Sequence, residues 1–338
     1  MVQLPKENRT ILITGGAGFI GSNFIPLFLT KNQGYNVVNL DKLTYAGSLD
    51  NTAEIQNNPR YSFVHGDICD AGLVEEIFLK YQISGVFHFA AESHVDNSIT
   101  SPAAFIDTNI KGTFTLLEIA RQYWKGIENR FHHISTDEVF GSLGDTGYFT
   151  ENSNYQPNSP YSASKASADF LVRSYHHTYG MNVVTSNCSN NYGPKQHDEK
   201  LIPTIIRSAI MGKEIPIYGN GKNIRDWLYV KDHCEGINVI FHKGKTGDTY
   251  LLGGNNEYEN LTIANTICLK LDALRPKKSG SYTDQINFVN DRAGHDFRYA
   301  IDSSKSNNEL GWEAIEKFDS GLDKTIDWYL NKYQDLII

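Results

Sequence analysis

A glycine-rich loop close to the N-terminus constrains the fold of this chain more than any other feature. Residues 11–14 read as a buried strand, and Gly15, Gly16, Gly18 and Gly21 follow just before and within a helical pattern. In a strand–loop–helix unit such glycines permit a tight turn, let the backbone approach a pyrophosphate at the positive end of the helix, and let helix and strand pack closely. The loop therefore predicts a dinucleotide-binding βαβ unit.

Strands and helices alternate regularly up to about residue 190. The expected strands are mostly apolar and rich in β-branched and aromatic residues, as strands covered on both faces are. They lie at residues 10–14, 36–40, 61–65, 85–90, 131–135 and 182–187. Helices are expected between them, at residues 18–30, 72–81, 102–124 and 161–179. This alternation predicts an α/β protein with a Rossmann-like, doubly wound parallel sheet and right-handed crossovers.

The C-terminal part predicts a smaller α/β domain that binds the substrate. Its elements are shorter, and we expect them at residues 201–211, 215–218, 260–274 and 320–330. A chain of 338 residues exceeds what one core usually serves, so two domains are expected. We assign residues 1–188, with a return near 222–248, to the dinucleotide-binding domain. The smaller domain is then formed by residues 189–221 and 249–338.

Composition and charge argue against several classes of protein. The net charge of −8, with no basic block, argues against nucleic acid as a partner. No apolar run reaches the length of about 20 residues that a membrane helix needs, and the polar first ten residues lack the apolar core of a signal peptide. The four cysteines are far apart and form no Cys-x-x-Cys pair, which is typical of free thiols. We therefore expect a soluble cytoplasmic protein with no metal site.

Asp41 indicates which dinucleotide binds. It closes the second expected strand 20 residues after Gly21, where a carboxylate can accept hydrogen bonds from ribose hydroxyls and would repel a 2′-phosphate. The adjacent Lys42 is the one residue that speaks for NADP. Asp67 and Ile68 follow the third strand, where an adenine contact is expected. Together these positions predict NAD.

Tyr161 and Lys165 form the second chemical feature. Their four-residue spacing places both side chains on one face of a helix. A free tyrosine has a pKa near about 10, which is too high for a general base at neutral pH. A neighbouring ammonium and a positive nicotinamide ring both favour the phenolate. Beside a dinucleotide site, the pair predicts a redox enzyme in which Tyr161 takes a proton.

These features are similar to those of the extended short-chain dehydrogenase/reductase family, and the similarity runs from about residue 9 to 332. In detail the chain resembles the nucleotide-sugar 4,6-dehydratases of that family. The segments that carry this resemblance are residues 41–47 (DKLTYAG), 90–96 (AAESHVD), 135–139 (STDEV), 187–193 (NCSNNYG), 225–230 (RDWLYV) and 294–296 (GHD). The resemblance also implies a homodimer, in which the helices at 102–124 and 161–179 pair across the dimer axis.

Asp137 and Glu138 favour dehydration over epimerisation. They follow Thr136 at the carboxyl end of the fifth strand, where the substrate crevice of such folds lies. Elimination of water needs one group that takes a carbon-bound proton and another that protonates the leaving hydroxyl. Two carboxyl groups can do this if their surroundings separate their pKa values. The alternative is that the pair merely favours the start of a helix, where acidic residues are common.

The resemblance implies a role for each group. Tyr161, held by Lys165, takes the proton of the sugar C4 hydroxyl, and Thr136 hydrogen-bonds that hydroxyl. Glu138 removes the C5 hydrogen, and Asp137 protonates the departing C6 hydroxyl. The substrate is then dTDP-glucose and the product its 4-keto-6-deoxy sugar. NAD is expected to stay tightly bound and to be recycled in every turnover.

Two sets of residues are predicted to form the binding sites. The cofactor is assigned to Gly15, Gly18, Phe19, Ile20, Gly21, Asp41, Lys42, Leu43, Thr44, Asp67, Ile68, Phe89, Ala90, Ala91, Ser93, Thr108, Tyr161, Lys165 and Asn191. The nucleotide-sugar substrate is assigned to Ser93, Thr136, Asn190, Lys200, Leu201, Pro216, Ile217, Tyr218, Arg225, Asn260, Asp291, Arg292 and His295. Arginine suits a diphosphate because its guanidinium can donate two parallel hydrogen bonds.

Three places depart from the family pattern. Residues 195–198 (KQHD) replace aromatic residues and a proline, Asn97 replaces an arginine, and Ala293 replaces a proline. These differences concern the shape of the substrate loops, and residue spacing alone does not choose thymine over uracil. Dehydration or 4-epimerisation of a UDP- or GDP-sugar therefore stays an alternative. A catalytically silent protein that binds NAD(H) is a further one, against which the complete set of chemical groups argues.

Overall fold

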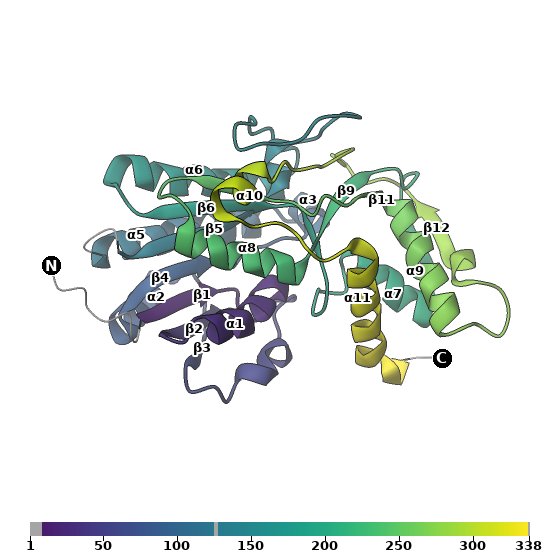
Figure 1. The fold of residues 1–338 in the computed structure, drawn as a ribbon, viewed down its shortest axis with the longest axis horizontal. Helices are drawn as coiled ribbons and strands as arrows, with labels where there is room; N and C mark the ends of the chain where they lie inside the picture. Colours follow the sequence, from purple (N-terminus) through teal and green to yellow (C-terminus); the bar gives the residue numbers. More distant parts are fainter. Residues whose placement is uncertain (1–8, 125–127, 337–338) are drawn as a thin grey trace.

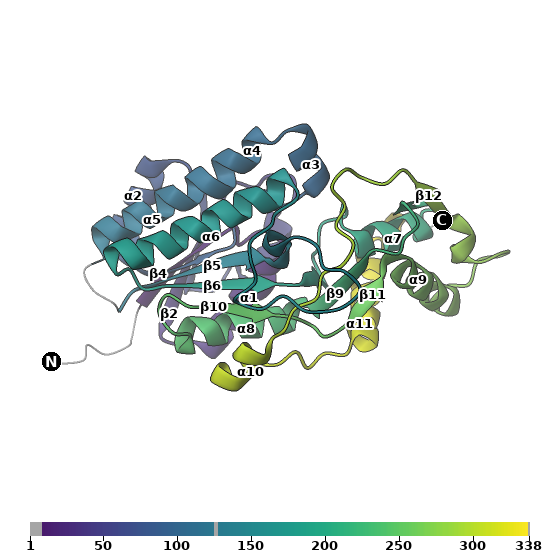
Figure 2. The same ribbon diagram turned by 90° about the horizontal axis from the view of Figure 1, so that it is seen from above.

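The dominant feature is a seven-stranded sheet in which every pairing is parallel (Figures 1 and 2). The structure, a computed structural model, describes residues 9–124 and 128–336; the expectations about the first eight residues and the last two lie outside this part. The strand order is β10-β6-β5-β4-β1-β2-β3. Their bounds are β1 Arg9–Thr14, β2 Tyr35–Asp41, β3 Tyr61–His65, β4 Ile83–His88, β5 Arg130–Thr136, β6 Val183–Cys188 and β10 Thr249–Leu252. The predicted doubly wound parallel sheet is confirmed.

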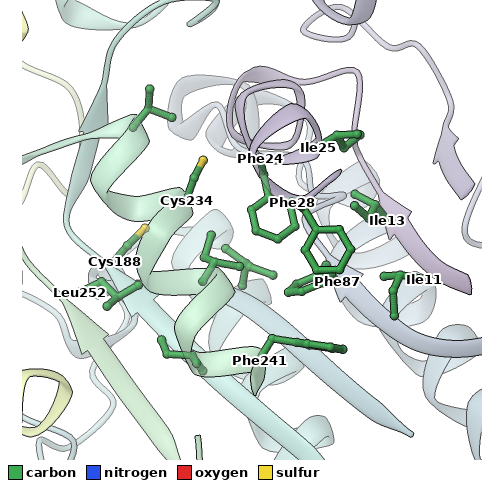
Figure 3. Close-up of a cluster of buried hydrophobic side chains, with 14 of the residues drawn as sticks. Ile11, Ile13, Phe24, Ile25, Phe28, Phe87, Cys188, Cys234, Phe241 and Leu252 are labelled. Atoms are coloured by element: carbon green, nitrogen blue, oxygen red, sulfur yellow. The ribbon is translucent and has the colours of Figure 1, made fainter. Parts of the chain in front are cut away.

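Helices cover both faces of this sheet, because alternate strand residues point to opposite sides. On one face, Phe24 and Phe28 of α1 (Phe19–Lys31) pack with Ile11 and Ile13 of β1, together with residues of α8 (Val230–Lys243) (Figure 3). On the other face, Leu12 packs under α2 (Ala71–Tyr81), α5 (Thr113–Tyr123) and α6 (Pro160–Tyr179). Figure 2 shows the second group side by side on one side of the strands.

The helix predicted at residues 102–124 is wound in three parts. A short α4 (Ala103–Phe105) leads into the π-helical turn η2 (Ile106–Gly112) and then into α5. The wider turn places the Asn109 side chain so that its Oδ1 accepts from Glu92 N at 2.8 Å while its Nδ2 donates to Ser164 Oγ at 2.8 Å. Such π-turns occur mostly at functional sites. The predicted helical stretch is confirmed, and the π turn within it is an addition that the sequence did not indicate.

A smaller α/β body lies beyond the carboxyl ends of the large sheet (Figure 1). It contains a three-stranded sheet, β11-β9-β7, and a parallel pair, β12-β8. Its strands are β7 Asn190–Tyr192, β8 Ile215–Tyr218, β9 Ile224–Tyr229, β11 Glu257–Glu259 and β12 Ile286–Val289; its helices are α7 Leu201–Ile210, α9 Asn260–Leu274 and α11 Phe318–Lys332. These elements share one hydrophobic core. The predictions for residues 215–218 and 260–274 match their elements end to end.

The chain returns to the large sheet later than the sequence indicated. Strand β9, inside the return predicted near 222–248, pairs with β7 and β11 of the small sheet. Helix α8 then covers the large sheet, and β10 pairs with β6 up to Leu252. Helix α10 (Ser304–Leu310) packs on β10 and α8, and Trp312 joins the same core. The assignment of residues 249–252 and 304–312 to the smaller domain therefore does not match the sheet pairing.

The remaining elements are short and lie in loops. They are the 3₁₀ turns η1 Leu49–Ile55, η3 Asp137–Phe140, η4 Tyr282–Gln285 and η5 Gln334–Leu336, and the helix α3 Val95–Thr100. In the part of the chain that the structure describes, no helix has the length and apolarity to cross a membrane.

Candidate active site

A cavity of about 300 Å³ opens at the carboxyl ends of the central strands. The loops that follow β1, β2, β4, β5 and β6 all contribute to its wall, as expected for an open parallel sheet. All the predicted cofactor residues except Leu43 line it, and so do the predicted catalytic residues. Of the predicted substrate residues, Ser93, Thr136, Asn190 and Lys200 line it.

The glycine loop fits a closely approaching dinucleotide. Gly15 has a φ of +72°, and a Cβ there would lie 2.6 Å from Ala90 N. At Gly21 a Cβ would lie 2.5 Å from the Gly15 carbonyl oxygen. Helix α1 begins at Gly18 without a capping side chain from any described residue, and its first turn, with Phe19 and Ile20, lines the cavity. The first amides of a helix are ready donors to an anion.

Asp41 and Lys42 have different surroundings. The Asp41 carboxylate accepts from Ala17 N at 2.8 Å and from Leu43 N at 2.8 Å, so it is held at the cavity wall. Leu43 therefore acts through its backbone. The Lys42 ammonium forms an ion pair with Asp67 at 2.7 Å. The charge of Lys42, which favoured NADP in the sequence, is thus paired with Asp67, and the geometry suits NAD.

Tyr161 and Lys165 lie at the beginning of α6. Ser159 forms a capping box with Ser162, and Pro160 occupies the first helical position, so the helix start is well defined. Both side chains are buried and line the cavity. The Lys165 ammonium donates to the Ile134 carbonyl oxygen at 2.8 Å, which ties the pair to the end of β5.

The pKa of Tyr161 is shifted by its surroundings. Burial raises it well above its ordinary value, and the Glu138 carboxylate raises it further, while a hydrogen bond with Thr136 opposes the change. Burial also lowers the pKa of Lys165 to about 8, against the opposing charge of Asp169. In the protein without cofactor the net direction is therefore upward, because of desolvation. That Lys165 and the positive nicotinamide ring together favour the phenolate stays a prediction.

Thr136, rather than either carboxyl group, caps the turn after β5. Its Oγ1 accepts from Glu138 N at 3.3 Å and donates to Asp137 Oδ1 at 3.3 Å. Asp137 is only 1% exposed, and its Oδ2 has no hydrogen-bond partner among the described residues. A capping role for the acidic pair is therefore unnecessary. Both carboxyl groups line the cavity next to Thr136.

The surroundings separate the two carboxyl groups. Burial raises the pKa of Asp137 well above its ordinary value, and the carboxylates of Glu138 and Asp226 raise it further, against the opposing charge of Arg225. Burial also raises the pKa of Glu138, and there Arg292 and Lys200 oppose the change together with Arg225. Asp137 therefore holds its proton more firmly, which suits an acid. Glu138 loses its proton more readily, which suits a base.

Polar groups without partners mark the substrate side of the site. Buried atoms of three predicted substrate residues make no hydrogen bond within the described chain: Asn190 Oδ1, Asn260 Oδ1 and Arg292 Nε. Lys200 reaches across the cavity and donates to the Ser93 carbonyl oxygen at 2.8 Å. Buried polar groups normally have partners, so these three atoms fit a polar ligand.

A second cluster joins the remaining predicted substrate residues. Tyr218 Oη donates to Asp96 Oδ2 at 3.1 Å, and Arg292 lies 3.9 Å from the other oxygen of Asp96. His295 Nδ1 and Asp291 Oδ1 lie 2.6 Å apart, and the His295 ring lies edge-on to Tyr218. The structure thus brings together Tyr218, Asp291, Arg292 and His295.

Three predicted substrate residues have other surroundings. Side chains alternate along β8, so Pro216 and Tyr218 point outward while Ile217 lies in the core of the smaller body. The Ile217 side chain is therefore not part of the site. Leu201 packs against the same core. Arg225 donates to the carbonyl oxygens of Ile224, Phe297 and Asp296 and lies over the Tyr299 ring, so it supports the loop that carries Asp291 to His295.

Sequence reasoning left out several residues of the cavity wall. They are Leu40, Ala46, Gly47, Gly66, Glu92, Ile134, Ser135, Cys188, Ser189, Gln196, His197 and Glu199. Cys188 and Ser189 end β6 and follow it, so the rule that ligands bind at the carboxyl ends of parallel strands could have found them. Gln196 and His197 lie on a loop from the smaller body, whose approach no local pattern reveals.

Comparison with known proteins gives a consistent result. The family model described as GDP-mannose 4,6 dehydratase matches residues 12–325. A dTDP-glucose 4,6-dehydratase from Xanthomonas campestris pv. campestris is 53% identical over 328 residues, which cover 95% of this chain and 93% of that protein. The crystal structure of DesIV, a dTDP-glucose 4,6-dehydratase from Streptomyces venezuelae with NAD bound, has a TM-score of 0.89 at 43% identity, covering 96% of this chain and 98% of that one.

A related activity gives a useful contrast. The UDP-glucose 4-epimerase of Thermotoga maritima, solved with UDP-glucose, has a TM-score of 0.84 but is only 26% identical. The match covers 96% of this chain and 99% of the epimerase chain. The fold is therefore shared with epimerases, whereas the sequence is much more similar to the dehydratases.

Proposed function

The chain belongs to the GDP-mannose 4,6 dehydratase family and, within it, to the dTDP-glucose 4,6-dehydratases, and we propose from this that it converts dTDP-glucose to dTDP-4-keto-6-deoxyglucose. The protein is then a hydro-lyase. The observation that carries this proposal is the pair formed by buried Asp137 and half-buried Glu138, which line the cavity beside Thr136 and Tyr161 and whose surroundings separate their pKa values.

NAD is the cofactor, as in the structural relative with NAD bound. The glycine cradle, the uncapped start of α1 and the paired charge of Lys42 fit it. When bound, NAD accepts a hydride from C4 of the sugar and returns it to C6, so it is regenerated within each turnover. The protein's own groups then have to move protons and hold the sugar.

Each proton transfer has a group that suits it. Tyr161 takes the proton of the C4 hydroxyl, with Lys165 and Thr136 placed to orient it. The C4 ketone acidifies the C5 hydrogen, which Glu138 removes as a base supported by Arg292 and Lys200. Asp137, kept protonated by burial, gives its proton to the C6 hydroxyl, and the C6–O bond breaks to release water. The proton on Glu138 exchanges with solvent, and C5 is reprotonated from this exchanged pool as C6 is reduced.

The nucleotide and diphosphate are assigned to the smaller body. Asn190, Asn260 and Arg292 offer polar atoms that have no hydrogen-bond partner among the described residues. Arg292 and Tyr218 both contact Asp96, and His295 packs edge-on to Tyr218. Arg292 and Lys200 supply positive charge for the diphosphate. Arg225 shapes this site through the three carbonyl groups that it binds.

The enzyme is proposed to be a cytoplasmic homodimer. Cys69, Cys188, Cys234 and Cys268 are all free thiols, which suits a reducing compartment. The outer surface of η2, α5 and α6 exposes the aromatic side chains Phe114, Tyr123, Phe170 and Tyr179, which suits a surface that packs on a second copy.

One assay tests the reaction directly. The purified protein is mixed with dTDP-glucose in D₂O, with UDP-glucose and GDP-mannose in parallel, and the products are examined by mass spectrometry. We expect loss of water and one solvent deuterium at C5, with the highest kcat/KM for dTDP-glucose. A product of unchanged mass, in which the configuration at C4 is inverted, would instead establish an epimerase.

The Glu138→Gln variant tests the role of the base in the same assay. Oxidation at C4 does not need Glu138, so bound NAD should still be reduced on mixing, which its near-ultraviolet absorbance reports. Water release should fall by roughly a hundredfold or more, because positioned acid–base groups contribute factors of that size. Product release at the normal rate would remove Glu138 from the mechanism.

A further inference from the structure

The loop between β7 and α7 forms part of the cavity wall although it belongs to the smaller body. Its residues Gln196, His197, Glu199 and Lys200 line the same cavity as the first turn of α1. We propose that Lys195 ties this wall to the dinucleotide-binding domain and thereby sets the rate at which NAD leaves the protein. The inference rests on the proposed function, because it takes NAD to be the ligand of the cavity.

Lys195 makes the connection with a single ammonium group. Its Nζ donates to the Asn51 carbonyl oxygen at 2.7 Å, to Glu54 Oε1 at 2.8 Å and to the Ser22 carbonyl oxygen at 3.3 Å. Ser22 belongs to α1, the helix that carries the glycine loop, and the other two belong to η1. One side chain thus uses all three of its donors on the dinucleotide-binding domain.

The backbone around Lys195 shows that the loop is held in this position. Lys195 has a φ of +71°, a left-handed backbone conformation that residues other than glycine rarely adopt. Next to it, Asn23 of α1 donates from its side chain to the Pro194 carbonyl oxygen at 3.0 Å. Such a conformation persists where surrounding contacts fix it. The ammonium contacts and the Asn23 bond are the contacts that fix residues 194 and 195 on this side.

The other side of the loop is anchored in the smaller body. Asp198 accepts from Lys332 at 2.9 Å and from the Tyr333 hydroxyl, and the Tyr329 hydroxyl donates to the Gln196 carbonyl oxygen. The loop is therefore fixed to α11 on one side, while Lys195 and Asn23 hold its first residues to α1 and Lys200 holds its end to Ser93. A ligand enclosed between two walls leaves more readily when the walls can separate. Lys195 is thus a positioning residue for cofactor retention.

The test measures NAD release from the whole enzyme. Wild type, Lys195→Met and the control Lys31→Met are purified with bound NAD, and free NAD is followed over time after gel filtration. Lys31 is a suitable control because it is also ion-paired and lies on α1, but its partner Glu235 is on α8 and not on the loop between β7 and α7. We expect release about ten times faster from Lys195→Met, the effect of losing charged hydrogen bonds of ordinary strength, and no change in the control.

Two further measurements distinguish a specific effect of Lys195 on NAD release from a general loss of stability. Thermal unfolding of each variant, stripped of NAD, should give equal midpoints for wild type and Lys195→Met. Lys195→Arg, which can donate to the same carbonyl groups, should restore slow release. The proposal for Lys195 would be overturned if Lys195→Met released NAD at the wild-type rate. It would also be overturned if fast release occurred only together with a lowered unfolding midpoint. A wild-type protein that binds no NAD at all would instead overturn the proposed function.

Discussion

At the scale of single residues, the charge of Lys165 depends on a carboxylate that does not line the cavity. Asp169 lies one helical turn beyond Lys165 on α6 and is buried with it. Its oxygens accept from Tyr155 Oη at 2.9 Å and from Asn187 Nδ2 at 3.2 Å, and His133 Nε2 lies 3.1 Å away. Burial lowers the pKa of His133 to about 4, so this ring is neutral and leaves the negative charge of Asp169 to act on Lys165.

The Asp169→Asn variant should lose activity at high pH sooner than the wild type. Lys165 must be charged to act on Tyr161, so kcat falls as pH rises through the Lys165 pKa of about 8. Asp169 favours the charged form, so its removal lowers that pKa and moves the alkaline limit of kcat down by about one pH unit. A pH profile of kcat measures this shift. Tyr155→Phe, which keeps the carboxylate, is the control, and equal profiles for Asp169→Asn and wild type would contradict the prediction.

The sequence could predict those residues whose chemistry and position coincide. Thr136, Asp137 and Glu138 end a strand, and a strand end in a parallel sheet is where the site must be. Asp169 and His133 gave no such signal, because their importance comes from burial and from contacts between β5, β6 and α6. The upward direction of the Tyr161 pKa in the protein without cofactor could not be predicted for the same reason: desolvation cannot be read from a four-residue spacing.

At the scale of elements, the glycine loop fixes how closely α1 approaches β1. A methyl group added at Gly21 would lie 2.5 Å from the Gly15 carbonyl oxygen and 2.7 Å from Gly16 Cα. Both atoms belong to the backbone, so they cannot move aside as a side chain can. The helix would have to shift, and with it the amides that face the cavity.

We expect Gly21→Ala to lower both stability and NAD binding. Overpacking of this kind costs about 1–3 kcal/mol. The Gly144→Ala variant is the matched control, because an added Cβ there meets no atom within 4 Å. Chemical unfolding and NAD titration of both variants measure the two effects. If Gly21→Ala behaved as Gly144→Ala does, the close packing of loop and helix would not matter.

The long elements of the first 190 residues could be predicted from the sequence, whereas several short strands could not. The strands of the large sheet up to β6 are five to seven residues long, and they were placed within two residues of their ends. Strands β7, β10 and β11 are three or four residues long, and such a run becomes a strand only where a partner strand lies beside it. The π turn of η2 likewise depends on the tertiary bonds of Asn109 rather than on its own sequence.

At the scale of the whole molecule, helices α5 and α6 lie side by side on an outer face (Figure 2). The exposed Phe170 of α6 is 54% accessible, which is unusual for an aromatic residue on a helix that is otherwise well packed. If two copies pack through this face, a charge at this position would be buried against the partner at a large cost.

The Phe170→Glu variant should therefore sediment as a monomer while the wild type sediments as a dimer. Ile315→Glu is the control, since Ile315 is 77% exposed in a loop away from these helices, and it should leave the dimer intact. Analytical ultracentrifugation at several concentrations measures the dissociation constant. A wild type that is monomeric throughout, or a dimer that Phe170→Glu does not weaken, would exclude this interface.

The late return of β10 to the sheet also governs the order in which the chain can fold. While the nascent chain is shorter than 252 residues, strand β6 lacks part of its β10 partner, and α10 has not yet packed on β10 and α8. An open strand edge is prone to pair with other chains. The N-terminal domain therefore cannot be a self-contained module that is finished first and exchanged between proteins. Cofactor domain and substrate domain have to be completed together.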